Sequence, residues 1–251
     1  MAEISRHRKM VTEWYGLQRL KECWIKPLTK EETSEVEFEK KLFLSIFRDT
    51  TKDFITTIEL GAGWGAWCLA TAGVIRNNLV PTTIKDYYCI GVEAEPTHFK
   101  WLKVHFKHSN INGVAINRIA AGLNGYKRFD TGYNPSTNYG QSTIRGVVNL
   151  LHLITGKTTK VQCITLDELT TMAKGLCFVH MDIQGSELEV MSKCKNLERI
   201  DYLFIGVHSK KIGEKIRKLL HSMELIVYLP PKSVNKEVSC GDGIQFYKKR
   251  A

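Results

Sequence analysis

The stretch FITTIELGAGWGAWCLATAGVI (54–75) decides the fold. Its first part, FITTIEL (54–60), has the length and the β-branched content of a buried strand. The glycine-rich turn GAGWG (61–65) follows at once, and a helical pattern then runs from Ala66 to Asn77. Glycines at such a junction let the backbone turn tightly and approach a ligand, and the helix N-terminus offers free N–H groups. A strand, a glycine turn and a helix in this order predict a nucleotide-type ligand site.

The same alternation continues along the rest of the chain. Further strand-like runs lie at 87–93, 114–122, 176–183 and 201–208, and helical patterns lie at 97–108, 187–194 and 211–223. Strands separated by helices imply right-handed βαβ units and a parallel sheet. The last two apolar runs, LIVYL and IQFYKK, are joined by a loop with Pro and Gly and predict an antiparallel pair at the sheet edge. We therefore expect an α/β fold with one doubly wound sheet.

Two regions lie outside this alternation. From about residue 8 to residue 47 the pattern is helical in two segments, and Ser34 with Glu37 predicts a capping box at the start of the second. We interpret residues 1–50 as an N-terminal helical cap on a domain that spans 51–251.

The segment 122–160 is rich in Gly, Asn, Ser and Tyr and is much longer than an ordinary connection. We interpret it as an insertion on the substrate side, with Tyr133, Tyr139 and Ser142 as candidate substrate-binding residues. It could instead be a disordered surface loop.

Glu59 distinguishes between two kinds of nucleotide-type ligand. It lies two residues before Gly61, the first of the glycines that continue with Gly63 and Gly65. A carboxylate there would repel the pyrophosphate of a dinucleotide, whereas S-adenosylmethionine (SAM) presents an amino group and a sulfonium, both cationic. The pattern therefore favours SAM, with Glu59 and the three glycines as cofactor-binding residues. A purely structural role for Glu59 would be that of a carboxylate that stabilises a helix N-terminus.

The second strand also ends in acidic residues, in GVEAEP (91–96). A carboxylate at this position typically binds the ribose hydroxyls of a nucleoside cofactor. We expect Glu93 to make that contact and take Glu95 as the second choice.

Two candidate catalytic residues lie at the ends of later strands. Asp182 belongs to HMDIQGSE (180–187) and His208 ends the run DYLFIGVH, so both are expected at the ligand-binding edge of the sheet. We propose that either side chain removes or orients an acceptor proton, and that Asp182 also contacts the cofactor. Purely structural roles would be helix capping for Asp182 and core packing for His208. His180 and Asp182 alone are too few ligands for a metal, so no metal is predicted.

At this point the chain resembles the FkbM family of SAM-dependent methyltransferases. The matching stretches are IELGAGWG (58–65), VEAEP (92–96), TLDEL (165–169), HMDIQGSE (180–187) and GVH (206–208), in the family's order. The first motif is shared by many methyltransferases, and the combination of TLDEL with D-x-x-G-x-E is much more specific. Neither the N-terminal 50 residues nor the insertion carries a motif that matches.

The resemblance implies a seven-stranded, Rossmann-like class I methyltransferase fold with SAM as cofactor. It also implies methyl transfer to a hydroxyl group of a small molecule, natural product or saccharide. It places Glu59 and the three glycines at SAM, Glu93 at the ribose and Asp182 at the rim of the active site. Many relatives have Glu where Gln184 stands, so no role that requires a carboxylate is transferred to that position.

Composition bears on the choice of partner and compartment. The chain has 251 residues and a formal charge of +10, which keeps RNA or another anionic substrate open as a partner. Against base methylation, the fourth strand leads into Asp-Ile-Gln-Gly and not into an Asn/Asp-Pro-Pro-aromatic turn. A non-catalytic binding module on the same fold and an NAD-dependent oxidoreductase also stay open. The polar, basic start, the absence of a long apolar run and seven dispersed cysteines predict a cytoplasmic protein with reduced thiols and no zinc. No oligomeric state is predicted.

Overall fold

A computed structural model describes residues 9–25, 27, 30–137, 154–229 and 243–250. Its centre is a seven-stranded sheet in the order β11-β12-β10-β9-β3-β4-β5. The strands are β3 (Phe54–Leu60), β4 (Asp86–Val92), β5 (Gly113–Ile116), β9 (Leu176–Met181), β10 (Tyr202–Val207), β11 (Met223–Leu229) and β12 (Gly243–Lys249). All neighbours are parallel except for β12, which is antiparallel to β10 and β11. The predicted parallel sheet with an antiparallel pair at its edge is confirmed.

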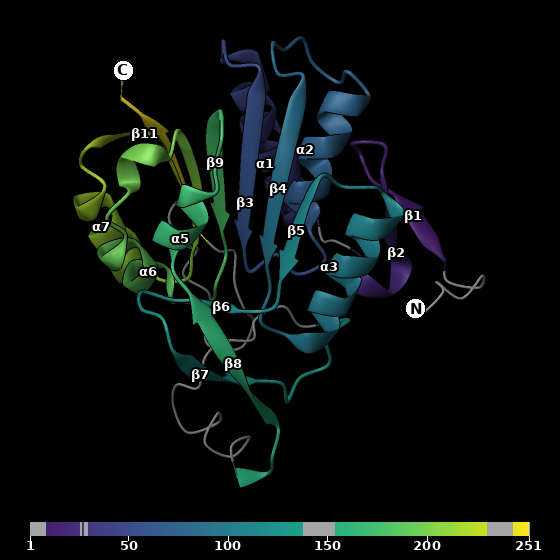
Figure 1. Ribbon diagram of the computed structural model, residues 1–251, viewed down its shortest axis with the longest axis vertical. Coiled ribbons are helices and arrows are strands. Elements are labelled where there is room, and N and C mark those ends of the chain that lie inside the picture. Colours follow the sequence, from purple (N-terminus) through teal and green to yellow (C-terminus); the bar gives the residue numbers. More distant parts are fainter. Residues whose placement is uncertain (1–8, 26, 28–29, 138–153, 230–242, 251) are drawn as a thin grey trace.

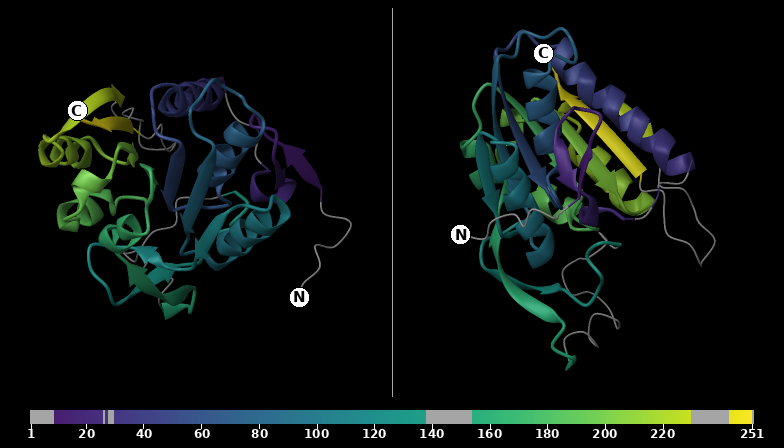
Figure 2. Two further views of the ribbon diagram at one scale, coloured as in Figure 1. Left: turned by 45° about the horizontal axis from the view of Figure 1, so that its top comes forward. Right: turned by 90° about the vertical axis from the view of Figure 1, so that its right-hand side faces the viewer.

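Helices cover both faces of the sheet (Figures 1 and 2). One face packs against α1 (Lys30–Arg48), α2 (Ala66–Arg76) and α3 (Pro96–His108), and the other packs against α5 (Leu166–Thr171), α6 (Glu187–Lys193) and α7 (Lys210–Leu219). The side chains of β9 alternate between the two apolar layers, with Phe178 facing α1 and Val179 facing α6. This two-layer packing fixes which strand residues face each half of the molecule.

The N-terminal segment differs from the prediction. In place of a first helix, β1 (Met10–Thr12) pairs with β2 (Gln18–Leu20) in a hairpin. Gly16 has a φ of +81°, and Leu20 is fully buried against Cys23 and Trp101. The segment whose apolar spacing indicated a helix therefore folds as a short hairpin, because contacts with α3 outweigh local helix propensity. The second helix is present, but α1 begins at Lys30, so the capping box predicted at Ser34 is wrong.

The described ends of the insertion form a small sheet. In it, β8 (Thr158–Ile164) lies between β6 (Ile119–Ala120) and β7 (Tyr126–Asp130), parallel to β6 and antiparallel to β7. The predicted long strand at 114–122 is divided between β5 and β6. This sheet projects beyond the carboxyl ends of β3, β4 and β5 (Figure 1). The insertion thus stands at the edge where ligands bind in open α/β folds.

Candidate active site

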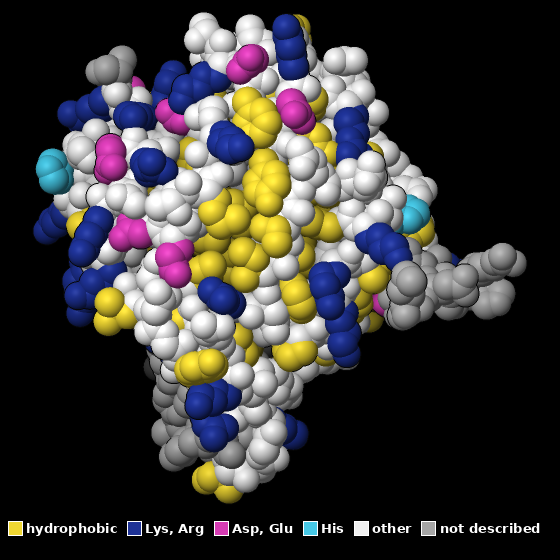
Figure 3. All heavy atoms as spheres, viewed as in Figure 1, with side chains coloured by type: hydrophobic (Ala, Val, Ile, Leu, Met, Phe, Trp, Pro, Cys, Tyr) yellow, Lys and Arg dark blue, Asp and Glu magenta, His cyan; other side chains and the backbone are white. Residues whose placement is uncertain are grey.

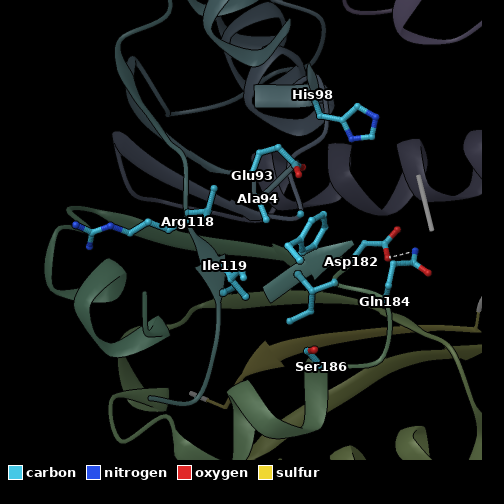
Figure 4. Close-up of a pocket in the computed structure, with 13 residues that line it drawn as sticks. Glu93, Ala94, His98, Arg118, Ile119, Asp182, Gln184 and Ser186 are labelled. Carbon is cyan, nitrogen blue, oxygen red and sulfur yellow. Dashed lines mark hydrogen bonds between the residues drawn. The ribbon is translucent and has the colours of Figure 1, made fainter. Parts of the chain in front are cut away.

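A pocket opens at the carboxyl edge of the sheet, between the strand ends and the small sheet of the insertion. Its volume, including the part open to solvent, is about 610 Å³. The walls come from the turns after β3, β4 and β9 and from the insertion, as Gly61, Glu93, Asp182 and Phe129 show. Figure 4 shows Glu93 and Asp182 from two different strand ends at the same pocket. The crevice lies beside the point where the chain reverses its direction across the sheet, between β3 and β9.

The glycine turn is shaped by close backbone contacts. Gly61 has a φ of +73°, and a Cβ atom there would lie 1.9 Å from the carbonyl oxygen of Asp182. Only glycine fits at this position, because both the left-handed backbone and the lack of space exclude a side chain. The turn therefore holds the ends of β3 and β9 together at the floor of the pocket.

Glu93 has the chemistry expected for a ribose site. Its carboxylate accepts hydrogen bonds from the backbone N–H groups of Gly63 at 2.6 Å and Glu95 at 2.7 Å, one on each oxygen. A carboxylate offers about four lone-pair sites, so each oxygen keeps capacity for one further donor. Burial raises the pKa of Glu93 to about 7, although the backbone hydrogen bonds act against this shift. The residue fits a pair of neighbouring hydroxyl groups.

The rest of the pocket suits the base of a nucleoside. Val92, Ala94, Ile119, Ala120 and Phe129 supply apolar walls. The His98 side chain also lines the pocket, and its Nε2 atom lies 2.9 Å from the carbonyl oxygen of Pro135. The apolar walls next to Glu93 match the adenosine part of SAM. His98, Arg118 and Phe129 were not predicted, and His98 meets the insertion, at Pro135, only in the folded chain.

Glu59 lies behind the glycine turn and does not line this pocket. It is buried, and its two oxygens accept hydrogen bonds from the backbone N–H groups of Trp67 at 3.1 Å and Cys68 at 3.0 Å. Burial raises its pKa to about 7. The carboxylate thus stabilises the start of α2, the structural role considered for it above, and supports the turn indirectly. Glu95 similarly caps α3 by accepting from the N–H of His98.

Asp182, His208 and Glu187 form a linked group beside the pocket. The Nε2 atom of His208 lies 3.2 Å from Oδ1 of Asp182, and its Nδ1 atom lies 3.0 Å from Oε1 of Glu187. Glu187 is fully buried and also accepts from the N–H of Gly185. Gln184, with a φ of +54°, donates its side-chain amide to Oδ1 of Asp182 at 3.0 Å (Figure 4). The role of Glu187 was not predicted, although the residue lies in the D-x-x-G-x-E motif.

The protonation states of His208 and Asp182 depend on each other. Burial alone would lower the pKa of His208, but its contacts with Asp182 and Glu187 raise that pKa to about 11. Burial alone would raise the pKa of Asp182, but the hydrogen bond and the charge of His208 outweigh it and lower that pKa. At neutral pH His208 is therefore an imidazolium that faces the Asp182 carboxylate. The ligand atoms of the group lie within 4.8 Å of one another, as in a metal site, but each histidine nitrogen already faces a carboxylate.

The remaining predicted site residues lie apart from the pocket or outside the described ranges. Tyr133 is 37% exposed and does not line the pocket. Tyr139 and Ser142 fall within 138–153, outside the described residues. His180 is buried against Trp67 with ring centroids 5.2 Å apart, and burial lowers its pKa to about 4. None of the described helices is long and apolar enough to span a membrane.

The chain is similar to one known family and, distantly, to solved structures of methyltransferases. The family model described as "Methyltransferase FkbM domain" matches residues 72–230. A precorrin-6y C5,15-methyltransferase from Geobacter metallireducens is similar at 12% identity and a TM-score of 0.42, over 84% of this chain and 87% of that one. TYW2 from M. jannaschii, crystallised with AdoMet, is similar at 14% identity and a TM-score of 0.45, over 100% and 90%. No curated protein sequence matches the chain.

The family match covers more than half of the chain, including the strands that end in Asp182 and His208. The chain belongs to the FkbM methyltransferase domain family, and its seven-stranded sheet is the class I fold expected from the sequence.

Proposed function

We propose that this methyltransferase transfers a methyl group to a hydroxyl oxygen of a small molecule, a natural product or a saccharide. The observation that carries the proposal is the Asp182 carboxylate, which lies at the cofactor pocket and is held by His208 at 3.2 Å. A neutral hydroxyl must lose its proton during methyl transfer, so a fixed carboxylate at this point supplies the base.

SAM, when bound, supplies an electrophilic methyl group on a cationic sulfonium. Glu93 and the apolar walls would hold its adenosine part, and the glycine turn would lie against the remainder. Asp182 would take the hydroxyl proton as the methyl group passes from the sulfonium to the acceptor oxygen, which would leave S-adenosylhomocysteine as the second product.

His208 positions Asp182 in this proposal. An imidazolium has no lone pair available for a proton, so His208 cannot act as the base while it is protonated. Its N–H groups instead fix Asp182 on one side and contact Glu187 on the other. The sequence left the choice of base open between Asp182 and His208, and this geometry favours Asp182.

An RNA or other anionic acceptor is the second candidate, favoured by the formal charge of +10. Figure 3 shows Lys and Arg side chains spread over the visible face among Asp and Glu, and not gathered along one groove. This distribution supports general attraction to anions more than a defined nucleic-acid track.

A screen for release of S-adenosylhomocysteine separates these candidates. Purified protein and SAM would be incubated with hydroxyl-bearing small molecules, with saccharides and with total RNA. We expect turnover with a hydroxyl compound and its loss in Asp182→Asn. Turnover on RNA alone, falling steeply with added salt, would favour the second candidate.

A further inference from the structure

The small sheet of the insertion has an inner and an outer face. On β7, Phe129 is buried and lines the cofactor pocket, whereas Tyr126 and Arg128 are exposed on the opposite side. On β8, Lys160 and Gln162 are exposed in the same way. In the register of the two strands Tyr126 lies opposite Gln162. Because Arg128 also lies opposite Lys160, the four exposed side chains share one surface, which we call the outer face.

The charges on this side of the insertion are all positive. Asp130 is the only acidic residue in the sequence from 122 to 160, and it is fully buried. Arg128, Lys157 and Lys160 are exposed, and none of them pairs with a carboxylate of the described residues. An anionic partner would therefore meet three cations without competition from a carboxylate of the insertion.

Two of these cations face each other across the strands. Like charges in directly opposite positions destabilise an antiparallel pair, so folding alone does not favour Arg128 beside Lys160. Arg128 donates a hydrogen bond to the hydroxyl of Thr158 at 3.2 Å, and Lys160 lies over the Tyr126 ring at 4.7 Å from its centroid. Both contacts leave the positive charges in place. An anion bound between Arg128 and Lys160 would offset their repulsion.

The small sheet and its adjoining loops also carry the most exposed large hydrophobic side chains of the described residues. Ile154 is 74% exposed, Leu123 is 67% exposed and Tyr126 is 63% exposed. Ile154 precedes β8, and Leu123 lies between β6 and β7. Exposed apolar side chains that gather on one unit mark a surface that binds a partner, whereas single ones do not.

The shape of the molecule makes this surface accessible. The small sheet projects from the body of the protein (Figure 1), and on its visible face Lys and Arg side chains lie among hydrophobic ones (Figure 3). A projecting surface can meet a flat and extended partner without obstruction by the seven-stranded sheet and its helices.

The aliphatic side chains distinguish a lipid bilayer from a nucleic acid. RNA offers phosphates to Arg128 and Lys160 and a base to stack on Tyr126, but it has no apolar interior for Ile154 or Leu123. In a bilayer, the anionic headgroups attract Lys and Arg and the acyl region takes up aliphatic side chains. The combination of charge and exposed aliphatic surface therefore favours the bilayer.

We propose that the outer face, together with Ile154 and Leu123, binds the surface of an anionic lipid bilayer. Since β7 also carries Phe129 in the wall of the cofactor pocket, this binding brings the pocket to the membrane surface. The proposal goes beyond the proposed function and does not require methyl transfer.

The test follows flotation of the full chain with vesicles of phosphatidylcholine, either alone or with about 30% phosphatidylserine. We expect at least about tenfold tighter binding to the anionic vesicles, and we expect this binding to weaken with added salt. Equal binding to the two kinds of vesicle, or no binding to either, would overturn the proposal.

A matched pair of double variants locates the binding surface. Arg128→Gln with Lys160→Gln removes two charges of the outer face and should weaken binding to anionic vesicles about tenfold or more. Lys215→Gln with Lys218→Gln removes two charges from exposed positions on α7 and should change that binding less than about threefold. Equal losses in the two double variants would attribute the binding to net charge and overturn the proposal.

Ile154→Ser tests the apolar part of the surface. Loss of the aliphatic side chain should weaken binding to anionic vesicles about threefold or more. Leu79→Ser is the control, because Leu79 is exposed in the loop between α2 and β4, and it should leave vesicle binding unchanged. An Ile154→Ser variant that binds vesicles as tightly as the wild type would contradict insertion into the bilayer.

Polyuridylic acid serves as the nucleic-acid probe. A chain that binds it and not the vesicles, and that loses this binding in the outer-face double variant, would assign the surface to RNA and overturn the proposal. S-adenosylhomocysteine binding by the same samples reports on the proposed function separately, because none of the substituted residues lines the cofactor pocket.

Discussion

The Nε2 atom of His208 lies 3.2 Å from Oδ1 of Asp182, at the point where two neighbouring parallel strands end. The contact joins residues that are far apart in the sequence, and it depends on the register that sets Ile205 beside Met181. The two side chains differ in role, because the His208 imidazolium holds the Asp182 carboxylate in place and that carboxylate faces the pocket.

Asp182→Asn tests the proposed base. The amide keeps the shape of the side chain but cannot take a proton, so methyl transfer to a hydroxyl should fall roughly 100- to 10,000-fold. S-adenosylhomocysteine should still bind, because Glu93 and the apolar walls remain. The measurement is product formation under single-turnover conditions. Unchanged turnover with intact cofactor binding would exclude Asp182 as the base.

His208→Gln tests the charge of the imidazole through stability. The pKa of His208 is raised from 6.5 to about 11 in the folded protein. A raised pKa stabilises the fold fully below the unfolded value, and this contribution is lost as pH rises through the folded value. The free energy of unfolding of the wild type should therefore exceed that of the variant by about 3 kcal/mol near neutral pH or below. This difference should shrink towards pH 11. Urea unfolding at several pH values measures it, and a difference that grows with pH would contradict the assignment.

Gly61→Ala tests the contact beneath the pocket. The added Cβ would lie 1.9 Å from the Asp182 carbonyl oxygen, so the free energy of unfolding should be about 3 kcal/mol lower than in the wild type. Gly156→Ala is the matched control, because Gly156 has a φ of +72° but no atom of the described residues lies within 4 Å of an added Cβ. It should lose only about 1–2 kcal/mol, the cost of the left-handed backbone. Equal losses in thermal unfolding would mean that the contact with Asp182 is unimportant.

Glu59→Gln separates a helix-stabilising role from a cofactor contact. In Gln an NH₂ group, which cannot accept, replaces one of the two carboxylate oxygens. One of the hydrogen bonds from Trp67 or Cys68 is therefore lost, and the free energy of unfolding should fall by about 1–2 kcal/mol. The affinity for S-adenosylhomocysteine, measured where the variant is folded, should change less than about threefold. A large loss of affinity for S-adenosylhomocysteine without loss of stability would mean that Glu59 contacts the cofactor.

The sheet could be predicted because its strands are marked locally in the sequence. β3 begins and ends where its apolar run does, and the switch from strand to helix at Gly65 is visible in the sequence. The N-terminal hairpin could not be predicted in this way. The spacing of Val11, Trp14 and Tyr15 also fits a helix, and tertiary contacts such as those of Leu20 with Trp101 and His105 select the hairpin.

The candidate site was predictable to the extent that it depends on strand ends. Glu93 and Asp182 each follow a strand directly, so their place at the carboxyl edge follows from topology. The separation of roles could not be predicted, because Glu59 turns toward α2 and Glu187 turns toward His208 only in the folded chain. The prediction that no metal is required remains to be tested, and activity unchanged by a chelator would support it.

The most direct test of the cofactor site is a calorimetric titration of the purified protein with S-adenosylhomocysteine, beside Glu93→Gln. The variant removes the carboxylate that accepts from Gly63 and Glu95 at the pocket. We predict roughly micromolar binding by the wild type and at least about tenfold weaker binding by the variant. A folded wild-type protein that does not bind S-adenosylhomocysteine would contradict the cofactor site and the catalytic proposal built on it.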